Sequence, residues 1–206
     1  MKALLALLLP AALVAQAPSV DVGRRVVDEI NRARAHPRAY ADLLRPWLDE
    51  FEGRLLKIPG EIPLETQEGR PAVAEAIAFL EAAEPLPPLA WSPGLAQAAL
   101  EHVKEQAGGA TGHAGRKGST PFQRMEHYGR WQDTAGEAIA YGPEDPRRVV
   151  LNLLVDDGVP TRGHRKSLFN PDFHVAGAAL GPHAEFRNLC VIDLAGGFVA
   201  DRPARR

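Results

Sequence analysis

Residues 175–197 read VAGAALGPHAEFRNLCVIDLAGG and contain two runs of small and β-branched residues. The runs, VAGAALG (175–181) and RNLCVIDLAGG (187–197), flank a short turn. Apolar and β-branched runs on either side of a short connection predict an antiparallel β-hairpin. We expect strands to be confined to this end of the chain.

The sequence upstream of the hairpin predicts helices. Apolar residues recur at helical spacing in VDVGRRVVDEINRARA (20–35), and the pattern stops before Pro37. Residues 53–70 carry several glycines and prolines and predict an extended or looped stretch. Further helices are expected where proline can occupy a first helical turn, at Pro37, Pro71, Pro93, Pro121 and Pro146.

Length and composition indicate one ordinary folded domain. The chain has 206 residues, of which 45% are hydrophobic and 24% charged, which excludes collagen-like and wholly disordered proteins. The formal net charge of -2 gives no reason to expect a nucleic-acid partner. The single cysteine, Cys190, excludes an intrachain disulfide and a cysteine-rich metal site, and its apolar surroundings predict a core position.

The N-terminus has the layout of a secretory signal peptide. Lys2 precedes an apolar run over residues 3–15, and Ala15-Gln16-Ala17 forms a small-x-small cleavage pattern. The run is shorter than the roughly 20 residues of a membrane-spanning helix, so no stable transmembrane anchor is expected. The sequence therefore predicts a signal peptide over residues 1–17, a folded domain over 18–206, and secretion to the periplasm or the extracellular space.

Two histidines and two acidic positions are candidates for chemistry. His113 and His164 each follow a glycine in a loop-like context, where an imidazole can face a cleft, although a surface role is the simpler alternative. Glu137 lies within the small and apolar run GEAIAYG (136–142), so it needs a cation or hydrogen-bond donors if it is buried, unless it caps backbone. Asp156, in Asp-Asp-Gly, can also belong to a simple turn.

Familiar catalytic signatures are missing from the sequence. It contains no HExxH zinc motif, no Gly-x-Ser-x-Gly elbow and no Walker A loop. The chain therefore offers no recognisable nucleophile or oxyanion device, and we assign no catalytic residue.

An ordered series of motifs resembles the CAP superfamily, also called SCP or PR-1-like, which includes cysteine-rich secretory proteins, antigen 5, plant pathogenesis-related 1 proteins and bacterial secreted members. EINRAR (29–34) resembles the first helix of the family. The remaining motifs follow in the family's order: LAWSPGLAQAA (89–99), TGH (111–113), GEAIAYG (136–142), RGHR (162–165), NPDFHVAGAALG (170–181) and LCVIDLAGG (189–197).

This resemblance implies an α+β fold, a single-domain three-layer αβα sandwich with a small antiparallel sheet and a central cleft. It implies that the cleft presents His113 and His164 as ligands of zinc or another divalent metal. The resemblance also implies that Glu137 and a second acidic residue lie there. Asp156 is the best match for that second position, and Asp157 is the alternative because DDGVPTR (156–162) lengthens the turn.

The resemblance leaves three classes of function open. We favour a secreted protein that binds a divalent metal and a small or lipid-like ligand in its cleft. A metal-dependent hydrolase of peptides or esters, with Glu137 as general base, is the alternative. The third hypothesis is an extracellular interaction module with an unidentified protein partner. An insertion at about residues 45–88 is expected to extend the packing of the domain or to cover the cleft.

Overall fold

The structure is a computed structural model that describes residues 17–201. The signal peptide expected over residues 1–17 lies outside the described residues except for its last position. Within the described range, no helix has both the length and the hydropathy to cross a bilayer.

The described chain alternates helices with short and long strands. In order they are α1 (Val20–Ala35), α2 (Pro37–Asp42), the 3₁₀ helix η1 (Arg45–Asp49), β1 (Phe51–Glu52), β2 (Leu55–Leu56), β3 (Leu64–Glu65), α3 (Arg70–Ala82), β4 (Ala90–Trp91), α4 (Pro93–Gln106), the 3₁₀ helix η2 (Arg116–Gly118), α5 (Pro121–Glu126), β5 (Gly129–Tyr141), α6 (Pro146–Val155), α7 (Gly163–Leu168), β6 (Val175–His183) and β7 (Arg187–Ala200).

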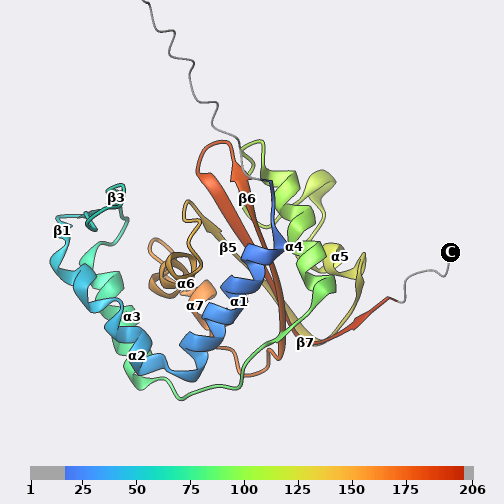
Figure 1. Cartoon of the computed structure of the whole chain (residues 1–206), viewed down its shortest axis with the longest axis horizontal. Coiled ribbons are helices and arrows are strands. Elements are labelled where there is room, and N and C mark those ends of the chain that lie inside the picture. The colour runs from blue at the N-terminus through green and yellow to red at the C-terminus, as the bar shows by residue number, and fades with distance from the viewer. Residues whose placement is uncertain (1–16, 202–206) are drawn as a thin grey trace, which may run out of the picture.

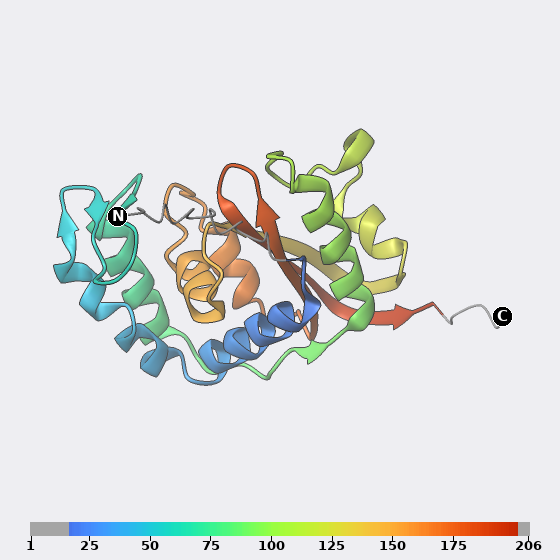
Figure 2. The same cartoon turned by 45° about the horizontal axis from the view of Figure 1, so that its top comes forward.

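A four-stranded sheet in the order β4-β6-β7-β5 forms the middle layer. The predicted hairpin is confirmed, since β6 and β7 pair antiparallel, and β5 then pairs antiparallel with β7. The short β4 pairs parallel with β6. Helices α1, α6 and α7 lie on one side of the sheet and α4 and α5 on the other, as Figures 1 and 2 show. The α+β three-layer fold class is therefore confirmed.

Helices begin at the prolines where the sequence predicted them. Prolines open α2, α4, α5 and α6, and α3 begins one residue before its proline. The side chains of three capping residues accept the orphan N–H groups of the first turns, which fixes where these helices start. These residues are Ser92 for α4, Thr120 for α5 and Asp145 for α6.

The prediction that strands occur only at the end of the chain is wrong. β5 is a 13-residue strand, and it was missed because GRWQDTAGEAIAY is rich in glycine, alanine and charge, which have low strand propensity. A register shift between Gln132 and Ala135, with Asp133 at a φ of 63°, also breaks its alternation. Pairing with β7 along most of its length makes this segment a strand.

The insertion also contains strands that the sequence did not predict. β1, β2 and β3 form a separate three-stranded antiparallel sheet of two-residue strands. With η1 and α3 this small sheet lies at the end of the molecule opposite α4 and α5 (Figure 2). The insertion thus extends the helical layer that contains α1 and α6.

Small residues in β6 allow helices to approach both faces of the sheet closely. A Cβ atom added to Gly177 would overlap the backbone of Ala96 in α4. A Cβ atom added to Gly23 in α1 would overlap the carbonyl of Ala178 on the other face. The run VAGAALG therefore acts as a thin layer between two helices, which explains its alanines and glycines.

Gly177→Ala should destabilise the fold because α4 must move away from β6 to admit the new methyl group. Overpacking of this kind costs about 1–3 kcal/mol. Urea unfolding measures the loss, and Gly108→Ala is the control because no atom lies within 4 Å of its added Cβ. Equal unfolding midpoints for Gly177→Ala and the control would contradict the close approach of α4.

Candidate histidine and carboxylate site

The candidate site lies at the edge of the sheet formed by β5. His113 is carried by the loop between α4 and η2, from one helical layer, and His164 by the first turn of α7, from the other. Their imidazole ring centres are 6.4 Å apart. Two histidines far apart in sequence therefore face each other, and His164 lies on a short helix rather than in the expected loop.

Glu137 holds His113 from the edge strand. The side chain of Glu137 is 1% exposed, and its Oε1 atom lies 2.8 Å from Nδ1 of His113. Its Oε2 atom accepts a 2.7 Å hydrogen bond from the guanidinium of Arg124 in α5. A buried carboxylate is stabilised when a cation and donors meet it, so both oxygens of Glu137 have the partners that burial requires.

Arg124 links Glu137 to the loop that carries His113. This arginine is fully buried, and its guanidinium also donates to the backbone carbonyls of His113 at 3.0 Å and Ser119 at 3.1 Å. The same guanidinium therefore neutralises Glu137 and fixes the backbone of the His113 loop.

Asp156 holds His164 on the opposite side of the site. The residue caps the C-terminus of α6 in the left-handed conformation, with φ 54° and ψ 44°. Its buried carboxylate lies 2.6 Å from Nδ1 of His164 and accepts the backbone N–H of the same residue at 2.9 Å. Asp156 therefore fixes both the ring and the backbone of His164.

Asp157 has a different role. Its carboxylate accepts the backbone N–H groups of Gln67 at 2.6 Å and Glu68 at 2.8 Å, both in the insertion. Of the two acidic residues considered from the sequence, Asp156 is the one that contacts a histidine.

The hydrogen bonds define which ring nitrogens remain available. A carboxylate beside Nδ1 favours the tautomer with the proton on Nδ1 and the lone pair on Nε2. Within residues 17–201, the Nε2 atoms of His113 and His164 have no hydrogen-bond partner. Each imidazole is thus oriented by its carboxylate, with the Nε2 lone pair left available.

The side chains that a divalent ion could use at this site are the two imidazoles of His113 and His164. Among the described residues, no group of three or more His, Cys, Asp or Glu side chains is placed to hold a metal ion together. Two imidazoles bound to one tetrahedral Zn²⁺ ion through Zn–N bonds of about 2.0–2.1 Å have ring centres about 5 Å apart. The ring centres of His113 and His164 are 6.4 Å apart, so the rings must move closer together to share one ion. The side chain of His113 is 52% exposed, so its ring is not enclosed by protein on the side that faces solvent.

The insertion holds the segment that carries Asp156 and His164. The guanidinium of Arg162 binds both oxygens of Glu68, at 2.6 and 2.7 Å, and binds Glu75 at 2.7 Å. It also donates to the backbone carbonyl of Asp156 at 3.0 Å. The insertion is therefore part of the support of the site, in addition to the packing role predicted for it.

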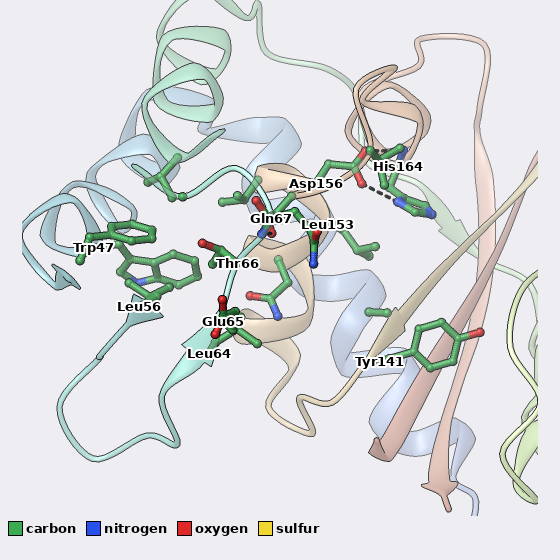
Figure 3. A pocket seen from close by; sticks show the side chains of 18 of the residues that line it. Trp47, Leu56, Leu64, Glu65, Thr66, Gln67, Tyr141, Leu153, Asp156 and His164 are labelled. Atoms are coloured by element: carbon green, nitrogen blue, oxygen red, sulfur yellow. Dashed lines mark hydrogen bonds and ion pairs between the residues drawn. The ribbon is translucent and has the colours of Figure 1, made fainter. Parts of the chain in front are cut away.

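A cavity of about 290 Å³ opens between the insertion and α6 and extends to His164. Figure 3 shows Trp47 and Leu56 of the insertion facing it, with Asp156 and His164 at the opposite end from Trp47. Leu153 of α6 lies between the two ends. Its wall combines apolar side chains such as Trp47, Leu56 and Leu153 with polar ones, including Thr66 and Gln67 along its length and Asp156 beside the histidine.

Sequence reasoning missed two residues of the site. Nothing in the short helix PFQRME indicates that Arg124 is buried against Glu137. Asp193 in β7 is fully buried and lies opposite Glu137 in the strand register. Asp193 is a carboxylate within the apolar run LCVIDLAGG, just as Glu137 is a carboxylate within the small and apolar run GEAIAYG.

Cys190 has the core position expected from the sequence. The residue is fully buried in β7, and this burial raises the pKa of its thiol to about 12. A thiol in that state is not a nucleophile at neutral pH.

The family model of CAP, the cysteine-rich secretory protein family, matches residues 27–194. The chain belongs to the CAP family. The resemblance inferred from the ordered motifs is thereby confirmed, and the match includes the insertion and all four histidine and carboxylate positions of the site.

Two solved structures resemble this CAP protein over part of its length. An outer surface protein from Borrelia burgdorferi matches with a TM-score of 0.45 and 24% identity, covering 53% of this chain and 78% of the other. An extracellular protein containing a SCP domain from Bacillus anthracis matches with a TM-score of 0.44 and 25% identity, covering 58% of this chain and 37% of the other. No curated protein sequence matches the chain.

Glu68→Gln should lower stability at neutral pH, and the difference from the unsubstituted protein should shrink in acid. Hydrogen bonds from Arg162 and the Gly158 backbone lower the pKa of Glu68 from 4.5 to about 2. A lowered folded-state pKa contributes stability above the unfolded value, and that contribution disappears as pH falls from about 4.5 to about 2.

Urea midpoints measured across this pH range test the contribution of Glu68. The control is Glu65→Gln, because Glu65 is an exposed neighbour whose ion pair with Arg54 at 3.4 Å is exposed on both sides and should matter little. A destabilisation by Glu68→Gln that stays constant down to the acid end would contradict the role given to the Glu68 charge.

Proposed function

We propose that this CAP protein binds a divalent metal ion through Nε2 of His113 and Nε2 of His164. The observation that carries the proposal is the pair of imidazoles, one from each helical layer. Each of them forms a hydrogen bond at Nδ1 with a buried carboxylate. Carboxylate–histidine–metal arrangements fix the ring orientation and increase the basicity of the ligand nitrogen. Such support at both rings is expected of ligands rather than of two unrelated surface histidines.

Two protein ligands leave coordination positions open. A bound divalent ion would act as a Lewis acid and could bind an oxygen atom of a small ligand. Glu137 and Asp156 keep the imidazole protons on Nδ1, and Arg124 balances the charge of Glu137. Neutral imidazole is the form that binds metal, so protons compete with the ion in acid.

Binding is better supported than hydrolysis. A general base needs a carboxylate that can reach and accept the proton of a water molecule. Both oxygens of Glu137 are already engaged, by His113 and by Arg124. The role that this geometry favours for Glu137 is to orient His113.

We further propose that the cavity beside His164 takes a small amphiphilic ligand with an anionic head. The indole of Trp47 and the side chains of Leu56 and Leu153 offer an apolar wall. The polar end contains the carboxylates of Asp156 and Asp157, which repel an anion unless a metal ion lies between them. Binding of such a ligand should therefore require the metal.

We propose that this function is exerted outside the cytoplasm. The support is the N-terminal signal sequence, with its apolar run over residues 3–15 and its Ala15-Gln16-Ala17 pattern. The chain has a single cysteine, so no disulfide within the chain stabilises the domain there.

Zn²⁺ should bind the mature protein with a stoichiometry of one in isothermal titration calorimetry at neutral pH. His113→Ala and His164→Ala should each abolish binding because one imidazole alone is a weak site. Asp156→Asn should weaken binding by roughly 10–100-fold, the usual effect of losing the partner of a ligand. The affinity should also fall as the solution is made more acidic.

His127→Ala is the matched control for zinc binding, since His127 is an exposed histidine bonded to Glu101 away from the site. It should bind Zn²⁺ as the unsubstituted protein does. Zinc binding that survives the loss of both His113 and His164 would contradict the proposed ligands.

Decanoate should bind in the presence of Zn²⁺ and bind much more weakly in its absence. Trp47→Ala should reduce the affinity by about tenfold or more, since burial of a large apolar group is worth about 1.5–3 kcal/mol. Ile62→Ala is the control because Ile62 lies in the same insertion, is 72% exposed and does not line this cavity. Equal decanoate affinities with and without metal would contradict the proposal that the carboxylate of the ligand binds beside the metal ion.

A further inference from the structure

Asp193 is fully buried next to Glu137. It lies in β7 directly opposite Glu137 of β5, so the two side chains share one face of the sheet. Its other neighbour in the sheet is Gly177 of β6, which has no side chain and packs against the backbone of Ala96 in α4. Asp193 itself is fully buried, so water cannot solvate its carboxyl group.

The charges around Asp193 do not provide for a second carboxylate. Arg124 already pairs with Glu137 at 2.7 Å, and this pair is neutral overall. Among residues 17–201, neither oxygen of Asp193 accepts a hydrogen bond from any donor. An ionised Asp193 would thus be a buried charge without a partner, which is a costly arrangement.

One proton removes this conflict. Two carboxyl groups in contact can form a hydrogen bond only if one of them is protonated. Glu137 is the one that accepts from Arg124 and faces Nδ1 of His113, so it is the ionised member. The shared proton therefore belongs on Asp193.

We propose that Asp193 is a neutral carboxylic acid that donates a hydrogen bond to Glu137 and thereby positions Glu137 against His113. Burial and the negative charge of Glu137 raise the pKa of Asp193 well above its ordinary value, against the opposing effect of Arg124. Its effect on metal binding rests on the function proposed above, whereas its protonation does not.

This arrangement gives the Glu137 carboxylate three donors that approach from different directions. Arg124 holds it from α5, His113 from the loop after α4, and Asp193 from the neighbouring strand. A carboxylate held in this way cannot rotate away from the imidazole that it orients. Asp193 is accordingly a positioning residue that acts on His113 through Glu137.

The protonation state is tested by infrared difference spectroscopy at neutral pH without added metal. The unsubstituted protein should show the C=O stretch of a protonated carboxylic acid in an apolar environment, and Asp193→Asn should lack it. Asparagine is close in shape to the neutral acid, so this variant is expected to fold. Absence of the band from the unsubstituted protein would overturn the proposal.

The positioning role is tested by Zn²⁺ titration of Asp193→Asn and Asp193→Leu. The amide of asparagine can still donate to Glu137, so Asp193→Asn should bind Zn²⁺ like the unsubstituted protein. Leucine fills similar space without a donor, and Asp193→Leu should bind roughly tenfold more weakly, at the low end of the effect of a direct partner of a ligand.

Equal zinc affinities for the asparagine and leucine variants would overturn the positioning role, because the donated hydrogen bond would then make no difference. Failure of the unsubstituted protein to bind Zn²⁺ would refute the proposed function. It would also remove the metal-binding consequence of Asp193, while the infrared band still decides its protonation.

Discussion

The ion pair between Arg124 and Glu137 is the interaction on which the site depends. Both side chains are buried, and together they join α5, the edge strand β5 and the loop that carries His113. Removing one partner of such a pair typically costs about 3–5 kcal/mol, because it leaves a charge in a medium that cannot solvate it. The same pair sets the orientation of one imidazole and, because its two charges cancel, leaves no cation free to balance an ionised Asp193.

The second half of the site is built differently. Asp156 ends α6 in the left-handed conformation, so its carboxylate turns back onto the first turn of α7. The segment between these helices is held by Arg162, whose partners Glu68 and Glu75 belong to the insertion. One histidine therefore depends on a buried pair inside the sandwich and the other on ion pairs with an added segment. The two histidines come from opposite sides of the sheet and can meet because β5 is its edge strand.

The sequence predicted the parts of this arrangement that have local signals. Proline and capping residues marked the helices, the β6–β7 hairpin followed from its apolar runs, and the ordered motifs indicated His113, His164, Glu137 and Asp156. β5 was missed because its strand character comes from pairing with β7 rather than from its composition. Arg124 was missed because its burial against Glu137 is a contact between separate elements. Asp193 does carry a local signal, because it is an isolated carboxylate in an apolar strand.

The most direct test of the account is a crystal structure of the mature protein soaked with Zn²⁺, with the ion located by anomalous scattering. We predict a single ion at the edge of β5, bound by Nε2 of His113 and Nε2 of His164. In that structure the two Nδ1 atoms should still contact Glu137 and Asp156. An ion bound elsewhere, or no ion between the two rings at saturating zinc, would contradict the claim that these four side chains form a metal site.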